Sequence, residues 1–204
     1  MWDQIIPFLT ASILLTFSPG PDIIYVLVRS MVYGYKQGIM TALGLVSGIL
    51  IHTSLVAFGV SAVIKQSENI FLFIKVLGAL YLLYLAYQVY KSNPEIAFSS
   101  DDITDKSMFS LYKQGFIMNV LNPKVGIFFL AFFPGFLWDP DGNTILQFYI
   151  LGAVFMLQAF FIFSSVAVLA DKISVYIKSH PKAGIFLKWM QVVIFILIAV
   201  LILV

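Results

Sequence analysis

Six long apolar stretches constrain the fold of this chain more than any other feature of its sequence. A transmembrane helix needs about 20 predominantly apolar residues, and each stretch meets that length while charged residues collect between them. The expected spans cover residues 5–28, 38–64, 70–90, 114–137, 145–170 and 184–204. Because 61% of the 204 residues are hydrophobic and only 11% are charged, a soluble globular domain is excluded. We predict an all-α polytopic membrane protein with a single transmembrane domain over residues 1–204.

The connections between the spans predict the orientation of the chain. The longest, residues 91–113, is expected to be a polar cytoplasmic loop, because it combines serines and a proline with several aspartates. The first, third and fifth connections share one side of a six-span protein, and the basic residues on that side are Arg29, Lys36, Lys91, Lys106, Lys113, Lys172, Lys178 and Lys182. The opposite side holds Lys65 alone. Since Lys and Arg are enriched in short cytoplasmic loops, we predict a multi-pass inner-membrane protein with both termini outside.

Two of the six spans contain residues that interrupt a helix. Proline removes a backbone hydrogen bond and clashes with the preceding helical turn, and glycine is a poor helix former. The expected breaks are at Pro19, Gly20 and Pro21 in the first span and at Pro123 in the fourth. The six spans divide into two halves of three, and an odd number of spans inverts the second half. The two broken helices therefore occupy corresponding positions in two inverted three-helix halves.

The residues before the prolines predict where the chain becomes helical again. Ser18 precedes Pro19 and Asn122 precedes Pro123. Serine and asparagine are favoured N-caps, and proline is favoured at the first helical position. Each of these two pairs is therefore expected to begin a half-helix.

The depth of the breaks favours a binding site over simple kinks. Pro19 precedes Arg29 by ten residues and Pro123 follows Lys113 by ten, which is about 15 Å of helix in each case. Both breaks should then lie near the middle of a hydrocarbon core of about 30 Å. A lone proline usually only kinks a membrane helix, but irregular backbone at this depth needs a protein or cavity environment. Paired interruptions in corresponding helices indicate the binding site of a transporter.

Asp22, His52 and Lys124 are ionisable residues within the spans. A charge at the bilayer centre costs about 2.5–3.5 kcal/mol, so these side chains are expected to face the bundle interior. Asp22 could carry a proton, and an ion pair with Lys124 is the structural alternative. His52 shares a helix face with Gly44 and Gly48, where small residues let another helix approach. This histidine could relay protons or could bond to a neighbouring backbone group.

Composition excludes several other classes of function. The net charge of +2 is small and dispersed, so no nucleic-acid partner is expected. The chain has no cysteine, which excludes disulfides, thiolate nucleophiles and cysteine-ligated metals. We expect no cofactor and no resident metal.

The motifs of this chain resemble those of the LysE/RhtB family of amino-acid exporters. The resemblance rests on residues 18–22, on Gly38, Gly44, Gly48 and His52, and on residues 75–85 and 119–134. It covers about residues 5–137 and implies a six-helix inner-membrane protein that expels amino acids or close derivatives in exchange for protons. By analogy, the residues from Pro19 to Asp22 and from Asn122 to Lys124 occupy the motif positions of the family.

A zwitterionic amino acid requires one cationic and one anionic partner in the same pocket, and the two breaks offer both. The predicted substrate-binding residues are Ser18, Gly20, Asp22, Asn119, Asn122 and Lys124. Proton binding at Asp22 or His52 would compete with substrate and drive antiport. The expected partners are the amino acid, protons and the lipid bilayer, and homo-oligomerisation is left open.

Two alternatives remain at this point. The first is a metal-cation transporter that uses Asp22, His52 and the asparagines, although these ligands are few and Lys124 would repel the ion. The second is an intramembrane hydrolase that uses Ser18, His52 and Asp22 as a catalytic triad, although no oxyanion motif is evident.

Overall fold

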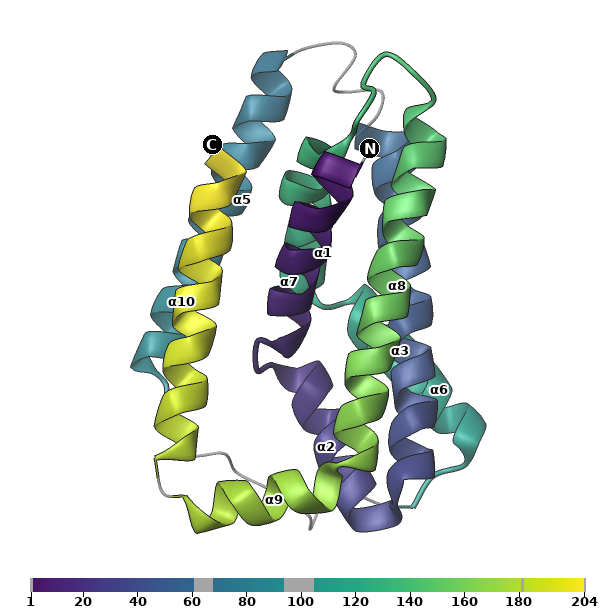
Figure 1. Ribbon diagram of the computed structural model, residues 1–204, viewed down its shortest axis with the longest axis vertical. Coiled ribbons are helices and arrows are strands. Elements are labelled where there is room, and N and C mark those ends of the chain that lie inside the picture. Colours follow the sequence, from purple (N-terminus) through teal and green to yellow (C-terminus); the bar gives the residue numbers. More distant parts are fainter. Residues whose placement is uncertain (1, 61–67, 94–104, 181, 204) are drawn as a thin grey trace.

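The computed structural model describes residues 2–60, 68–93, 105–180 and 182–203, and every regular element in these ranges is helical. The elements are α1 (Trp2–Phe17), α2 (Pro21–Tyr33), α3 (Tyr35–Leu55), the π-helix η1 (Val56–Val60), α5 (Glu68–Lys91), α6 (Met108–Val120), α7 (Pro123–Ile127), the π-helix η2 (Phe128–Phe132), the 3-10 helix η3 (Phe133–Phe136), α8 (Thr144–Val168), α9 (Ala170–Ser179) and α10 (Ala183–Leu203). Figure 1 shows an elongated bundle in which the long helices run side by side. The all-helical prediction is confirmed for the described residues.

The helices account for six membrane spans, two of which are bent. Four spans are single apolar helices, at Tyr35–Gly59, Asn69–Lys91, Thr144–Val168 and Ala183–Leu203. The other two are helix pairs that bend by 57° between α1 and α2 and by 48° between α6 and Pro123–Phe136. The predicted breaks in the first and fourth spans are therefore confirmed. These two spans run in opposite directions along the bundle, and both chain ends lie toward the same end of it (Figure 1).

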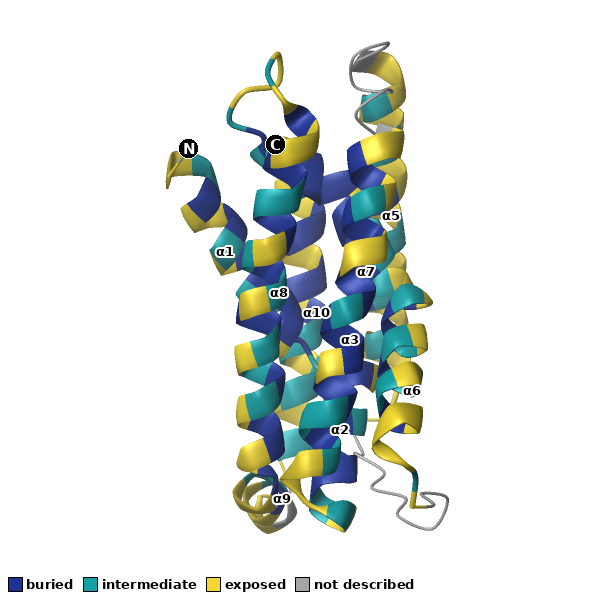
Figure 2. Ribbon diagram, turned by 90° about the vertical axis from the view of Figure 1, so that its right-hand side faces the viewer, coloured by how far each residue is buried: buried dark blue, intermediate teal, exposed yellow. Residues whose placement is uncertain are grey.

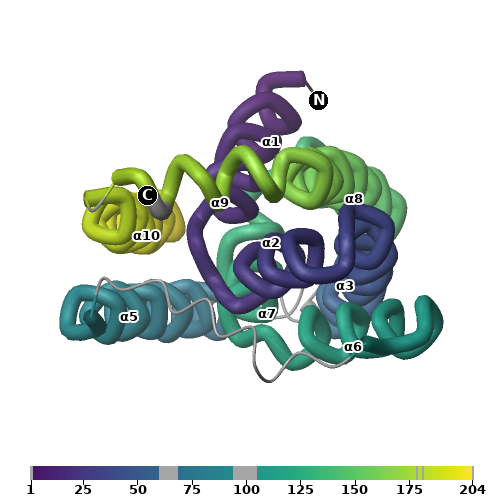
Figure 3. Tube along the Cα trace, turned by 90° about the horizontal axis from the view of Figure 1, so that it is seen from below, coloured from purple at the N-terminus to yellow at the C-terminus, as the bar shows by residue number. Residues whose placement is uncertain are grey.

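α3 and α6 pack closely against each other at one side of the bundle (Figure 3). A Cβ atom at Gly44 in α3 would overlap the carbonyl oxygen of Tyr112 in α6, and one at Gly115 in α6 would overlap the carbonyl oxygen of Thr41 in α3. Small residues let membrane helices approach in this way, where van der Waals packing rather than the hydrophobic effect drives association. The expectation that the Gly44 face meets another helix is confirmed.

The other helices complete the bundle around α2 and α7, which lie in its middle (Figure 3). α2 contacts α3, α6, α8 and α9, as the view from below shows (Figure 3), while α5 and α10 pack together at one side. Only 22% of the apolar segment of α5 is buried, against 56% for α3, so α5 presents most of its surface to lipid. In Figure 2 the buried positions continue through α3 and α7, whereas α5 is largely exposed.

The start of α2 differs from the expectation at Ser18. The backbone amide of Ser18 donates to the carbonyl oxygen of Leu14 at 3.0 Å, so this residue ends α1 instead of capping the next helix. α2 begins at Pro21 with Gly20 as its N-cap, in extended backbone. The reason is that Pro21 keeps the residue before it out of the helical region, so the second of the two prolines takes the first helical position.

The predicted loop 91–113 is shorter than expected. Residues 108–113 are helical, because Ser107 caps α6 with its side-chain oxygen, which accepts from the amide of Ser110 at 3.3 Å. Residues 94–104 lie outside the described ranges. The connection after the fifth span also contains a helix that was not expected, α9, which crosses the lower end of the bundle (Figure 1).

Candidate binding site between the two helix breaks

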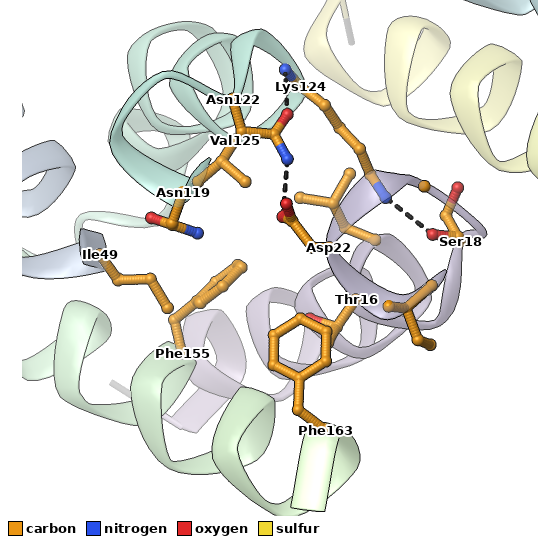
Figure 4. A pocket seen from close by; sticks show the side chains of 13 residues that line it. Thr16, Ser18, Asp22, Ile49, Asn119, Asn122, Lys124, Val125, Phe155 and Phe163 are labelled. Atoms are coloured by element: carbon orange, nitrogen blue, oxygen red, sulfur yellow. Dashed lines mark hydrogen bonds between the residues drawn. The ribbon is translucent and has the colours of Figure 1, made fainter. Parts of the chain in front are cut away.

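The two breaks meet, and each bonds to the other. Asn122 donates from its side-chain Nδ2 to Asp22 Oδ2 at 2.6 Å, across 100 residues of sequence. Lys124 donates from Nζ to the backbone carbonyl oxygen of Ser18 at 2.9 Å, across 106 residues. Figure 4 shows both bonds side by side. The ion pair between Asp22 and Lys124, which the sequence left open as the structural alternative, is absent: each side chain takes part in one of these two hydrogen bonds, and no salt bridge joins them.

Local structure in the second break sets the orientation of Asn122. Its side-chain Oδ1 accepts from the backbone amide of Lys124 at 3.0 Å, so Asn122 is the N-cap of α7, as predicted. Because the cap uses the oxygen of the amide, the nitrogen is the atom that points to Asp22. One side chain thus both starts a helix and joins the two breaks.

A cavity lies beside these bonds. Its lining residues are Leu15, Thr16, Ser18, Gly20, Asp22, Ile23, Ile49, Asn119, Asn122, Lys124, Val125, Phe155 and Phe163. They enclose about 410 Å³ of space between atoms, including the open mouth. All six residues predicted to bind substrate are among them, so the structure brings this set together from α2, α6, α7 and the two breaks.

Three buried polar atoms in the cavity have no hydrogen-bond partner within the protein. They are Ser18 Oγ, Asp22 Oδ1 and Asn119 Oδ1. A buried polar group without a partner costs about 1–3 kcal/mol, so such atoms call for a ligand or water. Lys124 also retains donors, because an ammonium group has three and the Ser18 carbonyl uses one. Asn119 turns its Oδ1 toward Gly48 of α3 and its amide nitrogen toward Asp22 (Figure 4). The cavity therefore offers a free oxygen of Asp22 and a free cationic donor in one place.

His52 lies beside this cavity without lining it. Its Nε2 is 3.0 Å from the backbone oxygen of Asn119, which is the backbone hydrogen bond that was expected as the alternative to a proton relay. His52 also packs against Phe129, with ring centroids 5.7 Å apart, so it contacts the surroundings of the cavity through both Asn119 and this ring. A role in proton coupling stays a prediction.

The apolar part of the cavity was not foreseen from the sequence. Phe155 and Phe163 come from α8, and Ile49 comes from α3. In Figure 4, Phe155 points into the same space as Asp22 and Asn119. From α10, Phe195 places its ring 5.8 Å from Lys124 Nζ, within reach of a cation–π interaction. An apolar residue within an apolar span carries no distinguishing signal, so only packing could identify these residues.

Different kinds of contact flank the cavity on its two sides along the bundle. Toward the chain termini, Phe155 packs against Phe128 and Phe129, with ring centroids 5.7 and 5.2 Å apart, and Phe8 and Phe133 extend this cluster. At the other end, Tyr25 in α2 donates to Gln114 Oε1 in α6 at 2.8 Å.

Lys106 supports the contact between Tyr25 and Gln114. Its Nζ donates to the same oxygen of Gln114 at 2.7 Å, so the residues before α6 are tied to the helix pair. An aromatic cluster thus covers one end of the cavity, and a small hydrogen-bond network lies at the other.

The two alternative chemistries find little support in this geometry. Within the described ranges, no group of three or more His, Cys, Asp or Glu side chains is placed to hold a metal ion. Ser18 Oγ has no hydrogen-bond partner, and His52 bonds to Asn119, so the serine and the histidine do not form a nucleophile–base pair.

Comparison with known proteins gives a family match over nearly the whole chain. The model of the LysE type translocator family matches residues 13–204. A homoserine/homoserine lactone efflux protein of Salmonella typhimurium is 31% identical over 175 residues, which cover 86% of this chain and 84% of the relative. An uncharacterized membrane protein of Bacillus subtilis, YrhP, is 30% identical over 195 residues and 91% of each chain. No solved structure matches.

Proposed function

Because this chain belongs to the LysE type translocator family, we propose that it exports amino acids or close derivatives across the cytoplasmic membrane. The membership confirms the family expected from the sequence motifs, and it makes the chain a multi-pass transport protein and not an enzyme. The relative from Salmonella typhimurium is named for homoserine, an amino acid, and for its lactone. This name supports an amino-acid cargo for the present chain.

The binding site in this proposal is the cavity between the breaks. The α-carboxylate of the cargo pairs with Lys124, and its α-ammonium takes the free Asp22 Oδ1. Charge-assisted hydrogen bonds of this kind are about twice as strong as neutral ones. The observation that carries the proposal is the presence of unpartnered buried acceptors beside a buried ammonium group, at the point where two broken spans meet.

Proton antiport follows if cargo and proton compete for Asp22. A carboxylate that holds the ammonium of the cargo cannot hold a proton at the same time, so each binding event releases the other. Protons that enter from outside would then displace the cargo from Asp22. The carrier would turn its site back toward the cytoplasm with Asp22 protonated. His52 is the second candidate for this role, acting through its bond to the backbone of Asn119.

Alternating access requires the cavity to open at one end at a time. We assign the end with Tyr25 and Gln114 to the cytoplasm, because the basic connections are on that side, and the aromatic end to the outside. The inverted halves would rock about the crossed bonds at the breaks. Both chain termini are then outside.

Asp22→Asn tests this proposal, because it keeps the shape of the side chain and removes its charge. In proteoliposomes with an imposed proton gradient, the variant should lose proton-driven amino-acid flux. Asp171→Asn is the matched control, since Asp171 is an exposed residue of α9 and should be dispensable. If Asp22→Asn retains full coupling, Asp22 is not the proton site. If the unaltered protein moves no amino acid, the export proposal fails.

A further inference from the structure

The cavity holds one negative and one positive side chain among the described residues that line it, Asp22 and Lys124. An α-amino acid brings one ammonium and one carboxylate of its own. If these groups pair with Asp22 and Lys124, as the proposed function has it, both charges of the site are used. No charged group then remains for the side chain of the cargo.

The other unpartnered polar atoms of the lining residues belong to Ser18 and Asn119. Ser18 is part of the first break, and Asn119 lies one helical turn before the second. Thr16 is already engaged, because its Oγ1 donates to the carbonyl oxygen of Ser12 at 2.8 Å and accepts from Gln158 Nε2 at 2.9 Å. Of the three unpartnered oxygens, Asn119 Oδ1 faces Gly48, so none of them supplies a charged partner for the side chain of the cargo.

The rest of the cavity wall is apolar. It consists of Leu15, Ile23, Ile49, Val125, Phe155 and Phe163. A cationic or anionic side chain that met this wall would lose its hydration without gaining a partner. An aliphatic side chain would instead bury apolar surface against two phenyl rings and several branched side chains.

We propose that the cargo is a zwitterionic amino acid whose side chain is uncharged and predominantly apolar. This inference rests on the proposed export function and refines it. It assigns Ile49, Phe155 and Phe163 as residues that determine specificity, because they line the space left for the side chain of the cargo.

The test compares four probes in proteoliposomes of the purified full chain: L-leucine, L-homoserine, L-lysine and L-glutamate. Initial rates are measured at equal concentrations below saturation. We expect L-leucine to be carried about a hundredfold faster than L-lysine or L-glutamate, which corresponds to about 2.8 kcal/mol. Rates for either charged amino acid within tenfold of L-leucine would overturn the proposal.

Two further outcomes distinguish this proposal from the proposed export function on which it rests. Transport of L-homoserine without L-leucine would overturn the assignment of the apolar wall and leave amino-acid export standing. Transport of none of the four probes would overturn export and, with it, this inference.

A substitution in the wall adds a gain-of-function test. Ile49→Glu places a second acid opposite the breaks and should raise the ratio of L-lysine to L-leucine transport at least tenfold. Ile49→Gln is the matched control, because glutamine has nearly the shape of glutamate and no charge. Its ratio of L-lysine to L-leucine transport should rise much less than that of the glutamate variant. If the glutamine variant admits L-lysine as well as the glutamate variant does, charge pairing is not the basis of selection and the proposal is wrong.

Discussion

Removal of the Asn122 side chain should separate the two breaks and cost more stability than the loss of an ordinary helix cap. Asn122 caps α7 through Oδ1 and bridges to Asp22 through Nδ2 at 2.6 Å. Loss of an N-cap costs about 1 kcal/mol. Loss of a hydrogen bond to a charged group costs about 1.5–3 kcal/mol.

These contributions together predict that Asn122→Ala destabilises the protein by about 2.5–4 kcal/mol. In a chain of 204 residues, 1 kcal/mol shifts the melting temperature by about 2–4 °C, so the midpoint should fall by about 5–16 °C. The assay is thermal unfolding of the purified protein in detergent. Asn143→Ala is the matched control, because Asn143 caps α8 by accepting from Leu146 N at 3.0 Å and makes no bridge. This control variant should lose only about 1 kcal/mol of unfolding free energy.

A double-mutant cycle isolates the bridge from the cap. The cap is lost in Asn122→Ala and in the double variant but not in Asp22→Ala, so its loss cancels in the cycle. The coupling energy then reports the interaction between the two side chains. We expect about 1.5–3 kcal/mol. A coupling energy under about 0.5 kcal/mol would refute the reasoning, because it would mean that the two breaks do not depend on each other for stability.

Three further predictions follow from the packing and the cavity. Gly44→Ala should destabilise the protein by about 1–3 kcal/mol, because the added methyl group overlaps the backbone of α6, whereas Gly135→Ala, which meets open space, should be nearly neutral in the same thermal assay. Thr16→Cys supplies a single cysteine in a chain that has none, and its alkylation should slow when transported amino acid fills the cavity; an unchanged rate would contradict the location of the site. Tyr25→Phe removes the hydroxyl bonded to Gln114 and should speed alkylation of that cysteine from the cytoplasmic side, while equal rates with and without the hydroxyl would show that this contact does not control access.

The residues of the breaks show how far local rules reach. Asn122 was predicted as a cap from its position before Pro123, and the structure confirms it, since capping depends on atoms within three residues. The same rule failed at Ser18. The second proline, Pro21, takes the first helical position instead of Pro19, so Gly20 and not Ser18 is the N-cap of α2. The helix α9 was missed for a related reason. It is short and not continuously apolar, so a search for membrane spans does not detect it.

The candidate site was likewise predictable from the sequence only in part. The sequence by itself determined the six apolar spans, the two interruptions and the polar residues around them, because bilayer thickness and proline geometry act on contiguous residues. Only the tertiary structure decided that Asn122 bonds to Asp22, that Lys124 reaches the Ser18 carbonyl, and that Phe155 and Phe163 complete the cavity. In an apolar span every phenylalanine looks alike in sequence. Which of them faces lipid and which faces a cavity depends on how helices distant in the sequence pack together.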